Sequence, residues 1–136
     1  MGVGGLLRDS HGNSICGFHA FNQGGNVLLS EALALKLGLM LSWERGFKDI
    51  ICNLDCRDLL HAIGDTESHV FLPILKDIVI LLKRQWCVTL EFIGRECNAP
   101  ADWLARRGAF SQDPSMAILD SPPQELEILL LQDRLA

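Results

Sequence analysis

Long hydrophobic runs are absent from this chain, and none approaches the roughly 20 residues that a membrane-spanning helix needs. The opening segment, MGVGGLLRDS, also lacks the basic and then hydrophobic stretches of a secretory signal. Leu6 breaks the myristoylation pattern that starts with Met-Gly. We therefore expect an intracellular protein, nuclear or cytosolic, that is not secreted and makes no membrane contact.

Two common phosphate-binding loops and a zinc-binding cysteine pattern are missing as well. The glycine-rich start has no GxGxxG or GxxxxGK[ST] sequence, so we expect no nucleotide-binding loop there. The odd number of cysteines, 5, and the absence of any Cys-x-x-Cys pair disfavour a structural zinc site. With no secretory signal, the cysteines are predicted to be reduced, buried thiols: Cys16, Cys52, Cys56, Cys87 and Cys97.

An excess of positive charge is also lacking. The formal net charge is −5, which by itself argues against nucleic-acid binding. Residues 1–110, however, hold 11 Lys and Arg against 12 Asp and Glu, whereas residues 111–136 hold one basic residue against five acidic ones. Most of the acidity therefore lies in the tail, and the rest of the chain permits a local basic surface without predicting one.

Hydrophobic periodicity and turn residues predict a single α/β domain. The first expected elements are a β-hairpin within residues 2–22, a helix at 27–45 ended by Gly46, and a strand at 50–54. A short helix follows, and then a helix at 69–85 with Pro73 in its first turn. The last are a strand at 86–95 and a helix from about 98. The strand at 50–54 is apolar on both faces, which predicts a sheet covered by helices on both sides. We expect residues 1–110 to form the domain and residues 111–136 a linker followed by an amphipathic helix from about Gln124.

Asp55 follows the strand at 50–54 directly, at the carboxyl end where ligands bind in open α/β sheets. Asp at such a junction is also a common helix N-cap, and Asp58 three residues later resembles a capping box. On this segment alone the cap is the better-supported interpretation, although one side chain can serve both roles.

Two further carboxylates also have a functional and a structural interpretation. Glu31 lies in the most apolar helix, on the stripe that holds Leu35 and Ser42, where a buried acid needs a cation or a metal. It is equally explained as a first-turn Glu stabilised by the helix dipole. Asp102 falls in the first turn of the helix that Asn98 is expected to cap, and taken alone it needs no ligand to explain it.

Carboxylates repel one another, so several carboxylates at one sheet edge are most simply explained by a divalent cation that they bind. Mg²⁺ prefers such oxygen ligands, and two ions about 3.5–4 Å apart can bind both the attacking and the leaving oxygen of a phosphodiester. Glu31, Asp55 and Asp102 are therefore the candidate metal ligands and catalytic residues.

Four segments together resemble the plant reverse-transcriptase-like ribonuclease H domain, a retroelement-derived member of the type 1 ribonuclease H family: GVGGLLRDSHGN, SEALALKLGLMLSWERGF, KDIICNLDCRDLLHAI and RECNAPADWLA. The tail SPPQELEILLLQD is similar to the closing segment of that group. The resemblance implies a ribonuclease H-like mixed sheet flanked by helices, and hydrolysis of the RNA strand of RNA–DNA hybrids with two Mg²⁺ or Mn²⁺ ions. By position, it implies that Glu31, Asp55 and Asp102 are the metal-binding acids.

One feature of that family is missing from this sequence. The family's first strand, central in its sheet, carries an Asp-Gly-Ser or Asp-Gly-Ala motif, and Asp9 in the expected hairpin turn cannot replace that Asp. We therefore expect a truncated or decayed copy without the N-terminal central strand, which binds metal weakly and cleaves poorly. Two alternatives stay open: an inactive nucleic-acid or protein interaction module that keeps the fold, and an unrelated small α/β protein whose acids only cap helices.

Overall fold

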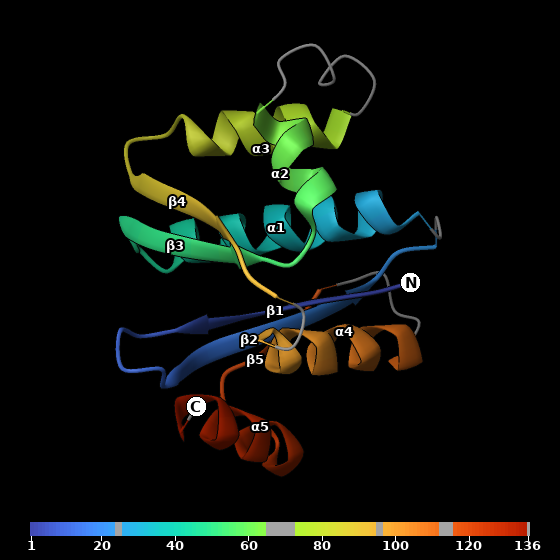
Figure 1. Cartoon of the computed structure of the whole chain (residues 1–136), viewed down its shortest axis with the longest axis vertical. Helices are drawn as coiled ribbons and strands as arrows, with labels where there is room; N and C mark the ends of the chain where they lie inside the picture. The colour runs from blue at the N-terminus through green and yellow to red at the C-terminus, as the bar shows by residue number, and fades with distance from the viewer. Residues whose placement is uncertain (24–25, 65–72, 95–96, 112–115, 136) are drawn as a thin grey trace. The chain divides into compact units, whose positions relative to one another are not determined.

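The computed structural model describes residues 1–23, 26–64, 73–94, 97–111 and 116–135, and it confirms an α/β fold (Figure 1). The chain divides into two compact units. The split unit comprises Met1–Gly25 and Arg95–Ala136, and the continuous unit comprises Asn26–Gly94. Among the described residues, no helix combines the length and the apolar character that crossing a bilayer requires.

Among its described residues, the split unit contains the predicted β-hairpin, a further strand and two helices. In chain order these are β1 (Gly2–Arg8), β2 (Ser14–Phe21), α4 (Ala99–Ser111), β5 (Ala117–Leu119) and α5 (Gln124–Leu135). The strands form one antiparallel sheet in the order β1-β2-β5. The hairpin is therefore confirmed, and α5 begins at the predicted residue.

The hairpin turn is held by Asp9. One oxygen of its carboxylate accepts the backbone N–H groups of His11 and Asn13, both at 2.9 Å. The hydrogen bond from the Asn13 backbone is the main reason why the pKa of Asp9 lies below its ordinary value. Gly12 completes the turn with a φ of 83°, a conformation that glycine adopts without strain. Asp9 thus has a structural role in the turn.

Helix α4 lies against the β1–β2 hairpin at a distance that glycine makes possible. A Cβ atom on Gly4 of β1 would overlap the backbone of Ala105 in α4, and a Cβ atom on Gly108 of α4 would overlap the backbone of Ala20 in β2. A larger side chain at either glycine would force the helix away from the strands.

The tail is more structured than the sequence predicted. Part of the expected linker forms β5, which pairs with β2 so that Ile118 lies opposite Phe18. So short a strand carries too few residues to show a period of its own, and its pairing with β2 determines its structure. Residues 112–115, also in the expected linker, lie outside the described residues. Leu126 and Leu130 of α5 are buried against Leu104 of α4. The domain boundary at residue 110 stays a prediction.

The continuous unit contains a parallel strand pair and three helices among its described residues. In chain order they are α1 (Val27–Glu44), β3 (Asp49–Leu54), α2 (Arg57–Gly64), α3 (Pro73–Leu82) and β4 (Cys87–Phe92). The strands pair in register along their whole length, from Asp49 opposite Cys87 to Leu54 opposite Phe92. Pro73 lies in the first turn of α3, as predicted, and the helix ends at Leu82, before the predicted end at residue 85. Residues 69–72 of the predicted helix lie outside the described residues.

Local chemistry defines both ends of α1. The Asn26 side chain accepts the Leu29 N–H at 3.1 Å, which makes Asn26 the N-cap. At the other end, the Arg45 N–H donates to the Leu41 carbonyl at 3.0 Å. Gly46 follows with a φ of 83° and ends the helix, as predicted.

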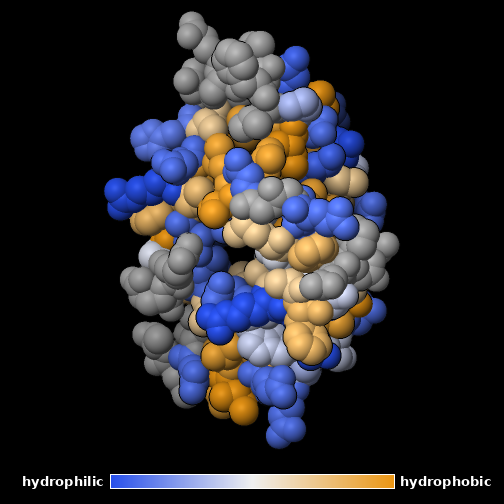
Figure 2. All heavy atoms as spheres, turned by 90° about the vertical axis from the view of Figure 1, so that its right-hand side faces the viewer, coloured by the Kyte–Doolittle hydropathy of each residue, from blue (hydrophilic) through white to orange (hydrophobic). Residues whose placement is uncertain are grey.

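Within the continuous unit, the described helices cover one face of the β3–β4 sheet, and cover of the other face stays a prediction. Alternate strand residues pack against a core that α1, α2 and α3 share: Ile50, Cys52, Leu54, Val88 and Leu90. Ile51 points to the other face and is 63% exposed. Ile51 makes the strand apolar on both sides, and the three described helices of this unit pack on the side opposite to it. Figure 2 shows that hydrophobic side chains also reach the visible surface among hydrophilic ones.

The cysteines among the described residues are all free, as predicted, but not all are buried. Cys16 is buried, Cys52 and Cys56 are partly buried, and Cys87 and Cys97 are exposed. Cys87 is exposed because it lies on the face of β4 that points away from the helices of the continuous unit. Burial raises the pKa of the Cys52 thiol to about 11, well above its ordinary value.

The close contact at Gly108 predicts a large response to a small substitution. Gly108→Ala should lower the free energy of unfolding by about 1–3 kcal/mol, because the added methyl group meets the Ala20 backbone. Urea denaturation followed by circular dichroism measures this. Gly64→Ala is the matched control, since a Cβ atom there meets nothing within 4 Å. Equal effects of the two substitutions would contradict the close packing of α4.

The exposure of the cysteines predicts two classes of thiol. Titrated at pH 8 with a thiol reagent, the folded protein should label first at Cys87 and Cys97. Cys52 should react only on unfolding, because its raised pKa reduces the thiolate fraction about a hundredfold and its side chain is partly covered. Mass spectrometry of the labelled peptides identifies the sites. Early labelling of Cys52 would contradict the packing of β3 on the helices.

Candidate functional site

The carboxyl ends of β3 and β4 meet at one edge of the continuous unit. Leu54 and Phe92 are paired, and just beyond them the Ile93 N–H donates to the Leu54 carbonyl at 2.8 Å. Asp55 follows Leu54 directly and is partly buried. The strands therefore end together, and Asp55 lies at the edge where parallel sheets bind ligands.

Asp55 does not occupy the N-cap position of α2. The helix begins at Arg57, and the carbonyl of Cys56 accepts the Leu60 N–H at 3.4 Å. The residue that accepts this first helical bond is the N-cap, so the cap is Cys56. Both the capping and the metal-ligand interpretations of the Asp55 side chain stay predictions.

Glu31 lies just beyond the first turn of α1, which contains no acidic residue. The stabilising effect of the helix dipole falls off within that turn, so the dipole explains Glu31 less well than its sequence position suggested. Leu35 and Ser42 on the same stripe are buried, and Glu31 is partly buried. The role of Glu31 as a cation ligand stays a prediction.

Asp102 lies in the first turn of α4, as predicted. Its Oδ2 atom accepts a hydrogen bond from Nη2 of Arg106, one turn later, at 2.7 Å. The Asp102 side chain is 43% exposed and that of Arg106 is 79% exposed. An exposed pair of this spacing contributes only about 0.3–0.5 kcal/mol, so a stronger ligand could displace the arginine.

The three predicted acids are divided between the two units. Glu31 and Asp55 belong to the continuous unit, and Asp102 belongs to the split unit. Within either unit, the described residues include no group of three His, Cys, Asp or Glu side chains that could hold a metal ion. The convergence of all three carboxylates on one metal site therefore stays a prediction.

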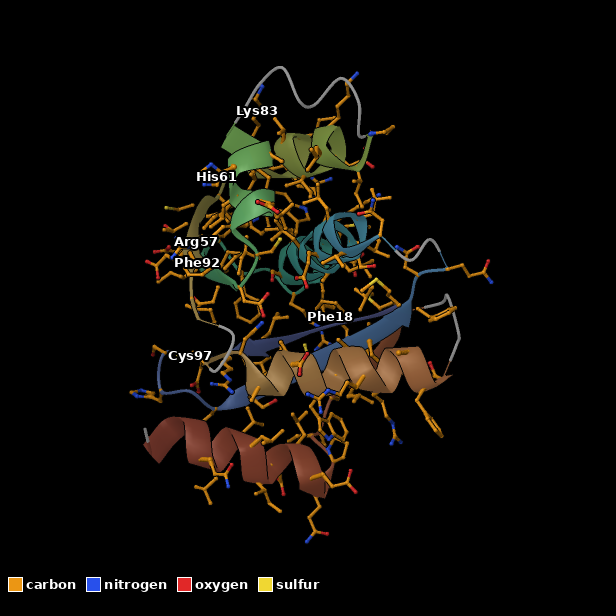
Figure 3. All side chains as sticks on the ribbon, turned by 45° about the vertical axis from the view of Figure 1, so that its right-hand side comes forward. Phe18, Arg57, His61, Lys83, Phe92 and Cys97 are labelled. Atoms are coloured by element: carbon orange, nitrogen blue, oxygen red, sulfur yellow. The ribbon has the colours of Figure 1, made fainter. Side chains whose placement is uncertain are left out.

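A pocket that the sequence did not predict lies at the same strand edge as Asp55. It has a volume of about 340 Å³ and is lined by Arg57, Leu60, His61 and Phe92. The guanidinium carbon of Arg57 lies 4.4 Å from the centre of the Phe92 ring (Figure 3). The spacing of Arg57 and His61 on α2 was a possible signal, but Phe92 comes from a distant strand and only the fold brings it there.

A second cluster of aromatic and basic side chains lies at the opposite, amino-terminal edge of β3 and β4. The rings of Trp43 and Trp86 meet edge to face, with centroids 5.1 Å apart. Lys48 Nζ lies 3.9 Å and Arg84 Cζ lies 5.0 Å from the centroid of the Trp43 ring. Both cations are held on a ring that helps to close this end of the unit, so we assign the cluster a structural role.

Comparisons with known proteins place the chain among relatives of much greater length. A family profile described as reverse transcriptase-like matches residues 1–108. An Arabidopsis thaliana protein, named provisionally as a ribonuclease H protein, is 28% identical over 136 residues, which cover 98% of this chain and 22% of that protein. The crystal structure of the prototype foamy virus protease-reverse transcriptase shares its fold, with a TM-score of 0.51 and 14% identity, over 80% of this chain and 20% of that one. The chain thus spans about a fifth of the length of either relative.

Proposed function

Because the chain belongs to the reverse-transcriptase-like family and has a ribonuclease H-like α/β fold, we propose that it is a metal-dependent nuclease domain that hydrolyses the RNA strand of RNA–DNA hybrids. The observation that carries the proposal is the position of Asp55. It is a partly buried carboxylate at the carboxyl edge of parallel strands. A carboxylate in such a place is suited to binding a ligand.

The proposed cofactor is a pair of Mg²⁺ or Mn²⁺ ions held by Glu31, Asp55 and Asp102. The chemistry of these donors fits, because all three are carboxylates, which hard divalent cations prefer. Asp102 would exchange its exposed Arg106 partner for the metal. Bound ions would activate a water molecule and stabilise the charge that develops on the phosphodiester oxygens. We expect slow cleavage, because three carboxylates supply few ligands for two cations.

Asp55→Asn tests the assignment with little change in size. Cleavage of a labelled RNA–DNA hybrid in Mg²⁺ should fall at least about 100-fold, because an amide oxygen is a weaker metal ligand than a carboxylate. Cleavage is measured by gel electrophoresis of the labelled RNA strand. Asp58→Asn is the matched control, since this exposed acid lies three residues away in the first turn of α2.

Three results separate the possibilities. Loss of cleavage in Asp55→Asn but not in Asp58→Asn supports the nuclease. If both variants cleave the hybrid as fast as the unmodified chain, Asp55 is not a catalytic metal ligand. Tight binding of the hybrid with no cleavage at any concentration of Mg²⁺ or Mn²⁺ would favour the alternative, an interaction module that keeps the fold.

A further inference from the structure

The pocket beside Asp55 combines a cation, an aromatic ring and a second polar side chain. Arg57 is the first residue of α2, and His61 lies one turn later on the same side of that helix. Phe92 is the last residue of β4, and its ring is accessible, with the residue 41% exposed. Figure 3 shows Arg57 and Phe92 next to each other, with His61 nearby on α2. Both elements of the pocket belong to the continuous unit.

The positive charge of Arg57 is available to a ligand. Among the described residues, Arg57 forms no ion pair within 4.0 Å, and its guanidinium group lies over the Phe92 ring. A guanidinium group held by an aromatic ring loses less conformational freedom on binding, and its N–H groups suit the paired oxygens of a phosphate. His61 adds a ring nitrogen that can donate a second hydrogen bond.

The remaining walls suit the part of a nucleotide next to the phosphate. Phe92 and Leu60 give the pocket an apolar side, on which a ribose or a base can pack. The hollow has a volume of about 340 Å³ and is open to solvent, so a nucleotide-sized group can lie against these walls.

We propose that this pocket binds one backbone phosphate and the adjoining nucleoside of a nucleic-acid strand, with Arg57 and His61 on the phosphate and Phe92 against the nucleoside. The proposal rests on the proposed function, since it takes nucleic acid as the partner. The pocket would be a second binding site, separate from the metal site proposed at Glu31, Asp55 and Asp102. Contacts to a phosphate carry no sequence information, so the pocket would fix the position of the strand relative to Asp55 and would not select a sequence.

Binding without cleavage isolates the role of the pocket. In EDTA, fluorescence anisotropy with a labelled RNA–DNA hybrid should show about tenfold weaker binding for Arg57→Ala, the loss expected for one charged hydrogen-bonding contact. In Arg57→Ala, the slope of log affinity against log salt concentration should become less steep by about 1. Phe92→Leu should weaken binding less, and Arg57→Lys should restore part of it, because the charge remains but the planar group is lost.

Arg84→Ala is the matched control. Arg84 is also an exposed arginine beside an aromatic ring in the continuous unit, but it lies at the opposite edge of β3 and β4. It should change the affinity by less than about twofold, apart from a uniform effect of net charge. Equal losses for Arg57→Ala and Arg84→Ala, or unchanged binding in Arg57→Ala, would overturn the proposal. Thermal melts of each variant confirm that the unit is folded.

A small-molecule titration separates this inference from the nuclease assignment. Adenosine 5′-monophosphate should shift the NMR signals of the His61 ring in the unmodified chain and not in Arg57→Ala, whereas inorganic phosphate should shift them less. If the hybrid binds through Arg57 but is never cleaved, the result contradicts the proposed nuclease activity and supports the proposed role of the pocket. If the hybrid does not bind and neither small molecule shifts His61, the pocket proposal is wrong.

Discussion

The in-register parallel pairing of β3 with β4 is the constraint on which the candidate site depends. Because Leu54 is opposite Phe92, both strands stop together, and whatever follows either strand reaches the same edge. A slip of one residue would turn every side chain of one strand to the other face. The register is fixed by the strand residues that pack on the three helices, so the hydrophobic core of the continuous unit determines where Asp55 and Arg57 lie.

The elements that could be predicted from the sequence are those set by neighbouring residues. Asn26 and Gly46 define α1 through bonds and backbone angles within a few positions. Asp9 similarly closes the hairpin turn with groups that follow it directly. The positions of Asp55 after a strand and of Asp102 in a first turn also follow from local patterns. Such features need no knowledge of what the segment packs against.

The features that the sequence did not predict depend on contacts between distant segments. Which face of β3 the three described helices of the continuous unit cover depends on where they pack, and the residue type of Ile51 gives no sign of it. Strand β5 exists because β2 offers it a partner. The pocket forms only because the fold brings Phe92 of β4 next to α2, which comes much earlier in the chain. The convergence of Glu31, Asp55 and Asp102 was predicted from the sequence, but it depends on both units and stays a prediction.

The split unit has a consequence for the order of folding. Its sheet joins Phe18 of β2 to Ile118 of β5, roughly a hundred residues later, with the continuous unit lying between them in the chain. Closing so long a loop costs more conformational entropy than closing the shorter loop between β3 and β4 in the continuous unit. During synthesis β1 and β2 leave the ribosome long before β5 and α5, so β2 is without its partner strand β5 in that interval.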